Sequence, residues 1–129
     1  MNDYTKTVLE KAVQEGVKTV INISSQSVYG SNRIGVAVEE TEVNPDNYYA
    51  MGKYSTELLT NSICKKINHS NIRMASLIGK DYEKRIINRL IRMAIEKGTY
   101  SISKSNMHFG YLDVEDDVDG IIKVVRSDR

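Results

Sequence analysis

The sequence predicts an α/β fold in which helices flank a small, mostly parallel sheet. Helix-like and strand-like segments alternate along the 129 residues, and such alternation is typical of parallel strands joined by crossover helices. The candidate strands are short and rich in β-branched residues, as buried strands are. Because the chain is about as long as one ordinary domain, we expect residues 1–129 to form a single domain.

The first half of the chain supplies a helix, a strand, a loop and a second helix. Apolar residues at helical spacing predict the first helix, which starts near Asn2 or Asp3 and stops at Gly16. Residues 17–23 are β-branched and predict a buried strand, and the polar residues 24–47 predict a long loop. The second helix is expected from about residue 48 to residue 66, with its packed face formed by Met51, Leu58, Leu59 and Ile63.

The second half continues the alternation. Residues 72–78 predict a strand ended by Gly79, and residues 86–94 predict a third helix closed by Gly98. Short strands are expected at residues 100–103 and 109–112. Residues 114–125 predict a final helix whose first turn carries three acidic residues, where the helix dipole favours negative charge.

Composition excludes several classes of protein. The net charge of +1 gives no reason to expect a nucleic acid or an anionic membrane as partner, and no apolar run reaches the length of a membrane span. Cys64 is the sole cysteine, so no internal disulfide can form. With no signal-like start, we expect a cytoplasmic protein. His69 and His108 lack neighbours at metal-ligand spacing, so no metal site is predicted.

Two short patterns indicate chemistry. Tyr49 and Lys53 lie one helical turn apart on one helix face, and a lysine ammonium favours a neighbouring phenolate, which can exchange a proton with a substrate hydroxyl. The same spacing also occurs by chance on solvated helices. The strand at residues 17–23 leads into Ser25 and Ser27, and ligands of open α/β sheets bind beyond the carboxyl ends of strands. These hydroxyls can bind a polyol, or they can simply cap the strand.

Taken together, the segments resemble the NAD-dependent epimerase/dehydratase family, the nucleotide-sugar branch of the extended short-chain dehydrogenase/reductases. The resemblance rests on Ser-Ser-x-x-Val-Tyr-Gly at residues 24–30, Asn-Pro at 44–45 and Tyr-x-x-x-Lys at 49–53. Residues 39–45 look like the acidic segment of the family, Arg73 followed by Gly79 looks like its Arg-x5-Gly strand end, and residues 109–118 resemble its downstream Tyr-hydrophobic-x-Val-x-Asp-Val segment. The likeness covers nearly the whole chain.

The resemblance implies a partial Rossmann-like doubly wound domain and a set of roles. Ser25 matches the residue that hydrogen-bonds the sugar hydroxyl, Tyr49 matches the general base, and Lys53 matches the residue that holds the nicotinamide ribose and assists the tyrosine. Tyr49 and Lys53 are thus the cofactor-binding candidates, because Tyr48 has Gly52 four positions later. Ser25, Ser27 and Arg92 are the substrate-binding candidates, with a plain exposed helix face as the alternative for Arg92.

The family likeness also implies NAD or NADP as cofactor, a nucleotide sugar as substrate and a homo-oligomer formed through the Tyr49 helix or an open strand edge. Family dehydratases carry an Asp-Glu pair where this chain has Gln26 and Ser27. That difference favours an epimerase, with a sugar reductase or dehydrogenase of the same family as the alternative. Lys80 stands where the family commonly has proline, so the substrate segment at residues 81–85 matches poorly.

The dinucleotide-binding signature is the main departure from the family. The eight glycines form no Gly-x-x-Gly-x-x-Gly or Gly-x-Gly-x-x-Gly motif, and such glycines let the backbone approach a pyrophosphate. The sequence begins at the helix before the fifth family strand. We favour a fragment of an enzyme that does not bind NAD alone. The alternative is a complete, non-catalytic remnant that serves as an oligomerising interaction module.

Overall fold

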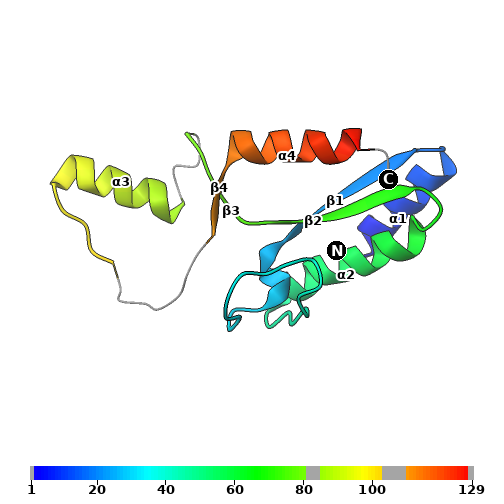
Figure 1. Cartoon of the computed structure of the whole chain (residues 1–129), viewed down its shortest axis with the longest axis horizontal. Coiled ribbons are helices and arrows are strands. Elements are labelled where there is room, and N and C mark those ends of the chain that lie inside the picture. The colour runs from blue at the N-terminus through cyan, green and yellow to red at the C-terminus, as the bar shows by residue number, and fades with distance from the viewer. Residues whose placement is uncertain (1, 81–84, 103–109, 128–129) are drawn as a thin grey trace. The chain divides into compact units, whose positions relative to one another are not determined.

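The computed structural model describes residues 2–80, 85–102 and 110–127 (Figure 1). It confirms the α/β class and the parallel pairing of strands. Contacts divide the chain into two compact units, residues 1–74 with 121–129 and residues 75–120, and the single domain stays a prediction. The elements follow in the order α1 (Asn2–Gln14), β1 (Thr19–Ser25), the 3₁₀ turn η1 (Gln26–Tyr29), α2 (Tyr48–Ile63), β2 (Asn68–Met74), β3 (Ser76–Ile78), α3 (Ile86–Lys97), β4 (Tyr111–Asp113) and α4 (Val114–Arg126).

The first unit is built on a parallel pair of strands. β1 and β2 pair from Thr19 opposite Asn68 to Ser25 opposite Met74. α2 packs against both strands, and α1 packs against α2 (Figure 1). Within the described residues, each of these strands is paired along one edge only.

Local sequence signals account for the helix ends in this unit. α1 ends in a Schellman arrangement, in which the Val17 amide donates to the Ala12 carbonyl and the Gly16 amide donates to the Val13 carbonyl. Gly16 has a φ of 73°, a conformation that glycine adopts without strain. At the start of α2, the Asn47 side chain accepts a hydrogen bond of 2.9 Å from the Ala50 amide, as an N-cap residue does.

The strand boundaries differ from those that the sequence predicts. The strand expected at residues 17–23 lies at Thr19–Ser25, because Ser24 and Ser25 continue the pairing with Arg73 and Met74. The single strand expected at residues 72–78 is two strands that pair in different sheets and are separated by Ala75. β2 also begins four residues earlier than expected, at the polar Asn68. Pairing with β1 outweighs the low intrinsic strand propensity of these polar residues.

The packed face of α2 also differs from the prediction. Of the four residues expected on this face, Leu59 and Ile63 are half-buried, but Met51 is 49% exposed and Leu58 is 52% exposed. The buried residues of the helix are Ala50, Thr56, Glu57 and Thr60. The helix therefore turns a largely polar face toward the strands. This face is stable because Glu57 accepts hydrogen bonds from Ser24 of β1 and Arg73 of β2, and the Thr60 hydroxyl donates to a carbonyl of the helix itself. Cys64, at the end of the helix, is fully buried.

The second unit contains a smaller parallel pair. β3 and β4 pair from Ser76 opposite Tyr111 to Ile78 opposite Asp113. α3 ends at Lys97 and is closed by Gly98 in the left-handed conformation, as predicted. The strand expected at residues 100–103 is absent over residues 100–102, and residue 103 lies outside the described residues. The next expected strand appears at Tyr111–Asp113, and Phe109 lies outside the described residues.

α4 begins where the sequence predicts its acidic first turn. The Asp113 carboxylate accepts a hydrogen bond of 2.8 Å from the Glu115 amide, which satisfies a backbone donor at the start of the helix. Glu115, Asp116 and Asp117 follow in the first turn. Across the helices of the described ranges, none combines the length and the apolar character needed to cross a membrane.

The segment at residues 30–47 is closed at its base by short contacts. The Asn44 amide donates to the Val28 carbonyl at 2.9 Å, and the Ser31 amide donates to the Asp46 carboxylate at 2.8 Å. Gly30 lies between these contacts with a φ of 82° and a ψ of 163°. A Cβ at this position would lie 2.6 Å from the Asn44 carbonyl oxygen. Glycine is therefore required here both by conformation and by space.

Replacing this glycine should destabilise the first unit. We expect Gly30→Ala to lower the free energy of unfolding by roughly 2–3 kcal/mol, because it adds backbone strain and a clash with Asn44. Gly35→Ala is the matched control, since Gly35 also has a positive φ, of 85°, but no atom lies within 4 Å of the added Cβ. The control should cost about 1 kcal/mol. Equal urea midpoints for the two variants would contradict this account of the loop base.

Candidate functional site

Tyr49 and Lys53 lie near the start of α2, beside the carboxyl end of β1. The Lys53 Nζ atom is 5.9 Å from the centre of the Tyr49 ring, as expected for residues one helical turn apart. The same ammonium donates a hydrogen bond of 2.8 Å to the Ile23 carbonyl of β1. Tyr49 is 57% exposed and the neighbouring Tyr48 is 94% exposed. The lysine thus connects the tyrosine face of the helix to the last residues of the strand.

Ser25 and Ser27 lie together where β1 passes into η1. Ser25 is the N-cap of η1, and its Oγ atom accepts a hydrogen bond of 3.2 Å from the Ser27 amide. The Ser27 hydroxyl donates to the same oxygen at 2.9 Å. Val28, in the middle of this turn, is fully buried and anchors it. Because a hydroxyl oxygen that accepts two bonds still keeps its own proton to donate, Ser25 can donate to a ligand oxygen.

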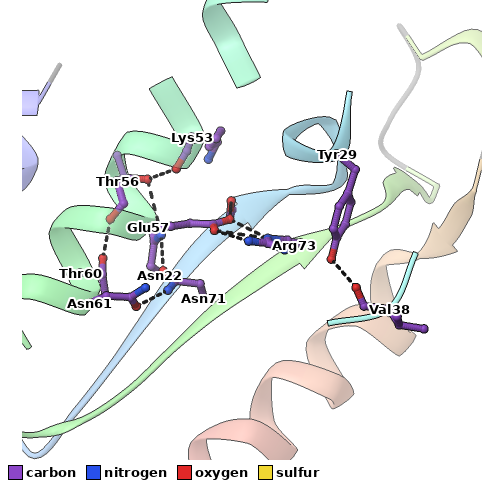
Figure 2. A network of polar contacts seen from close by, with 11 residues as sticks. Asn22, Tyr29, Val38, Lys53, Thr56, Glu57, Thr60, Asn61, Asn71 and Arg73 are labelled. Carbon is purple, nitrogen blue, oxygen red and sulfur yellow. Dashed lines mark hydrogen bonds and ion pairs between the residues drawn. The ribbon is translucent and has the colours of Figure 1, made fainter. Parts of the chain in front are cut away.

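A buried carboxylate lies between α2 and the two strands (Figure 2). Glu57 is 3% exposed, and it accepts hydrogen bonds from the Ser24 hydroxyl on β1 and from Arg73 on β2. The arginine binds in bidentate fashion, with its Nε atom 3.0 Å from Oε1 and its Nη2 atom 2.7 Å from Oε2. Such fork-like pairing is the strong and directional form of an ion pair.

Tyr29 extends this network toward the loop. The Arg73 guanidinium carbon is 4.8 Å from the centre of the Tyr29 ring, within the range of a cation–π interaction. The Tyr29 hydroxyl donates to the Val38 carbonyl at 3.2 Å (Figure 2). The hydrogen bonds that Arg73 donates to Glu57 raise the pKa of Arg73 above its ordinary value; desolvation opposes this shift, and Tyr29 adds to it. The guanidinium therefore stays charged.

A second group of polar contacts follows the same helix–strand interface. Asn22 on β1 donates to Asn71 on β2 at 2.8 Å, and Asn71 donates to Asn61 on α2 at 2.7 Å. The two strand residues are direct cross-strand partners. Together with Arg73, they make the α2-facing side of the strand pair polar (Figure 2). Ser24 adds a hydroxyl that donates to Glu57 on the same side.

Arg92 belongs to the second unit. It lies on α3, where it lines a cavity of about 510 Å³ with residues that include Ile78, Lys80, Asn88 and Asp113. The cavity therefore mixes apolar walls with charges of both signs. In the described part of the chain, no three His, Cys, Asp or Glu side chains lie close enough to hold a metal ion. His108 lies outside the described residues.

Glu57 is the residue of this site that sequence patterns did not predict, whereas Tyr29 and Arg73 appeared only as members of family-like motifs and without a role. One signal was present for Glu57. It follows Lys53 by four positions, as Lys53 follows Tyr49, so all three lie on one helix face. An arginine within a candidate strand was the matching signal, because a buried cation requires an acidic partner.

The sequence profile of the NAD dependent epimerase/dehydratase family matches residues 3–129. This chain belongs to that family. A curated relative, the dTDP-glucose 4,6-dehydratase of Streptomyces griseus, is 24% identical over 123 residues, which cover 91% of this chain. The membership accounts for the serine, tyrosine and lysine motifs.

Solved structures of epimerase/dehydratase proteins share the fold. The UDP-glucuronic acid 4-epimerase of Bacillus cereus, solved with UDP-glucuronic acid and NAD, superposes with a TM-score of 0.83 at 22% identity over 97% of this chain. The dTDP-glucose 4,6-dehydratase of Bacillus anthracis, solved with NAD, gives 0.84 at 23% identity, also over 97%. These similarities confirm the predicted Rossmann-like class.

The epimerase/dehydratase relatives are much longer than this chain. It spans 37% of the length of the Streptomyces griseus enzyme, and 41% and 42% of the two Bacillus proteins. The sequence thus corresponds to part of the fold that those enzymes use.

Proposed function

We propose that this chain is the sugar-facing part of an NAD(P)-dependent nucleotide-sugar epimerase. The observation that carries the proposal is the convergence of Tyr49, Lys53 and the Ser25 turn at the carboxyl end of β1, in a chain of the epimerase/dehydratase family. Ligands of open parallel sheets bind at this end of the strands.

Each of the three residues has a distinct task in this proposal. Ser25 donates its hydroxyl proton to an oxygen of the sugar and orients it. Tyr49 takes the proton from the sugar hydroxyl that is oxidised and returns it later, as a general base and acid. The Lys53 ammonium stabilises the phenolate that this transfer creates.

The residues present fit one end of a nicotinamide dinucleotide. Lys53 has ammonium protons suited to ribose hydroxyls, and it already binds a carbonyl oxygen at the strand end. A bound nicotinamide would supply reversible hydride transfer at the sugar carbon. The pyrophosphate end has no counterpart in these residues, because no glycine-rich turn occurs in the sequence.

The turn after β1 favours epimerisation over elimination. Gln26 and Ser27 occupy the positions where the resemblance places the acidic pair of dehydratases, and the Ser27 hydroxyl donates to Ser25. An amide and a hydroxyl are weak acids, so neither supplies the proton that eliminating a sugar hydroxyl requires. The curated relative is itself a dehydratase, so this difference separates the chain from it. A sugar reductase of the same family remains the alternative.

Arg92 is our candidate for the diphosphate of the sugar donor. It lines the cavity of the second unit beside Asn88 and Lys80, and arginine suits phosphate oxygens because of its planar fork of donors. Ser27, beside Ser25, completes the proposed substrate-binding set.

Calorimetric titration with NAD and NADH tests whether this chain binds the cofactor alone. We expect no binding up to about 1 mM, because the contacts to the pyrophosphate are missing. Lys53→Ala is the control. Micromolar binding that is lost in this variant would contradict our view of the missing half and place a complete cofactor site in these residues.

Single substitutions test which tyrosine acts as the base. In the polypeptide that binds NAD, whether this chain or a longer one that contains it, Tyr49→Phe should lower kcat by about 10²–10⁴-fold. Tyr48→Phe should leave kcat within about threefold, since Tyr48 is the more exposed of the pair. Epimer interconversion by chromatography is the measurement. The reverse order of effects would assign the catalytic role to Tyr48.

The exposed faces of α1 and α2 support self-association, which is also what an interaction module would need. Met51, Leu58 and Val8 are between 47% and 52% exposed, and a cavity of about 390 Å³ between the helices is lined partly by Asp3, Lys6 and Leu58. The acid and the base make this surface suited to a two-fold copy of itself. The unpaired edge of β1 is the alternative contact.

Light scattering after size exclusion tests the oligomer. We expect a dimer that Leu58→Glu converts to a monomer, because a charge would be buried in the contact. Ile34→Glu is the control, since Ile34 is 98% exposed on the loop. A dimer that survives Leu58→Glu would point to the β1 edge, and a monomer of the unmodified chain at high concentration would refute self-association.

A further inference from the structure

Three residues of α2 lie on consecutive turns, and two of them contact β1. Tyr49, Lys53 and Glu57 follow one another at intervals of four and share one helix face. Lys53 donates to the carbonyl of Ile23, and Glu57 accepts from the hydroxyl of the next residue, Ser24. The helix is thus fixed to two successive strand residues immediately before Ser25.

Glu57 also contacts, through Arg73, the far end of the turn that follows β1, which runs from Ser25 to Tyr29. It holds Arg73 with two hydrogen bonds, and Arg73 lies opposite Ser24 in the strand register. Arg73 in turn stacks on Tyr29, the last residue of η1. The turn that begins at Ser25 and ends at Tyr29 is therefore held at both ends through a single carboxylate (Figure 2).

We propose that Glu57 and Arg73 are positioning residues, which set the Ser25 hydroxyl against the Tyr49–Lys53 face of α2. They reach the proposed reacting groups only through Ser24, Tyr29 and the helix itself. The proposal rests on the function proposed above for Ser25, Tyr49 and Lys53, and it adds the pair that keeps those groups in register.

A general stabilising role makes a different prediction from a positioning role. A buried ion pair that only stabilises the unit would, when weakened, speed the opening of all amides in it alike. A positioning pair would release the Ser25–Tyr29 turn beyond any global effect, because the turn depends on Glu57 through two separate contacts. Two amides report on the turn, since the Ser27 amide donates to Ser25 and the Gly30 amide donates to the Ser27 carbonyl.

Amide hydrogen exchange on the 129-residue chain, followed by NMR, distinguishes the two roles. In Glu57→Gln and Arg73→Lys, the Ser27 and Gly30 amides should exchange faster than in the unmodified chain. Their increase in rate should exceed the increase at the Cys64 amide by about tenfold. The Cys64 amide donates to the Thr60 carbonyl at the other end of α2 and serves as the global reference. Asn61→Ala is the matched control, because it removes a hydrogen bond to Asn71 in the same interface without touching the carboxylate. In the control, the turn amides should follow the reference.

A second pair of variants keeps the test informative if the charge changes prevent folding. Tyr29→Leu removes the ring that stacks on Arg73, whereas Tyr29→Phe removes only the hydroxyl that donates to Val38. We expect faster exchange of the turn amides in Tyr29→Leu and exchange within about twofold of the unmodified chain in Tyr29→Phe. Turn amides that track Cys64 in all four variants would overturn the positioning role.

These readouts need neither NAD nor a sugar. A Tyr49→Phe variant with unchanged kcat in the NAD-binding polypeptide would therefore count against the proposed function and leave the positioning result standing. Conversely, an unaffected turn in an active protein would remove Glu57 and Arg73 from the account while Ser25, Tyr49 and Lys53 remained.

Discussion

The buried Glu57 carboxylate is the constraint on which the first unit depends. A charge removed from water is costly unless it is paired and hydrogen-bonded, and here Arg73 and Ser24 provide both. Removing one partner of such a pair typically costs about 3–5 kcal/mol, a large share of the stability of a small domain. Because its partners lie on both strands, the carboxylate determines how α2 lies across them.

Hydrogen bonds to α2 also explain why the strand pair can be polar. Asn22 and Asn71 occupy positions that a parallel sheet usually fills with apolar side chains. Their side-chain amides hydrogen-bond to each other and to Asn61. Two residues further along each strand, Ser24 and Arg73 bind the Glu57 carboxylate. Hydrogen-bonded networks of this kind depend on defined geometry, whereas apolar contacts tolerate sliding. Relative to an apolar interface, the polar one therefore constrains the register of helix and strands more tightly.

The order of elements was predictable from sequence because it depends on local signals. Gly16 and Gly98 mark helix ends by their conformation, and the structure uses both as predicted, whereas the Asn47 cap of α2 was not predicted. The strand at Asn68–Met74 was only partly predictable, since its first four residues are polar and become a strand by pairing with β1. Periodicity likewise predicted that Met51 and Leu58 are buried, but the helix buries Glu57 instead. That burial depends on Arg73, sixteen residues later, and no local pattern shows this contact. The roles proposed for Tyr49, Lys53 and Ser25 came from short motifs that resemble those of the family, whereas the residues that hold them depend on contacts distant in sequence.

The polar layer beneath α2 also bears on how this unit responds to temperature. Heat capacity rises on unfolding when apolar surface is exposed and falls when polar surface is exposed. An interface built from threonine, asparagine, serine, glutamate and arginine side chains exposes much polar surface when it opens. The stability of such a unit changes less steeply with temperature than that of an apolar core of equal size, so its stability curve is broad. Cooling and warming would then loosen the helix from its strands gradually on either side of a shallow optimum.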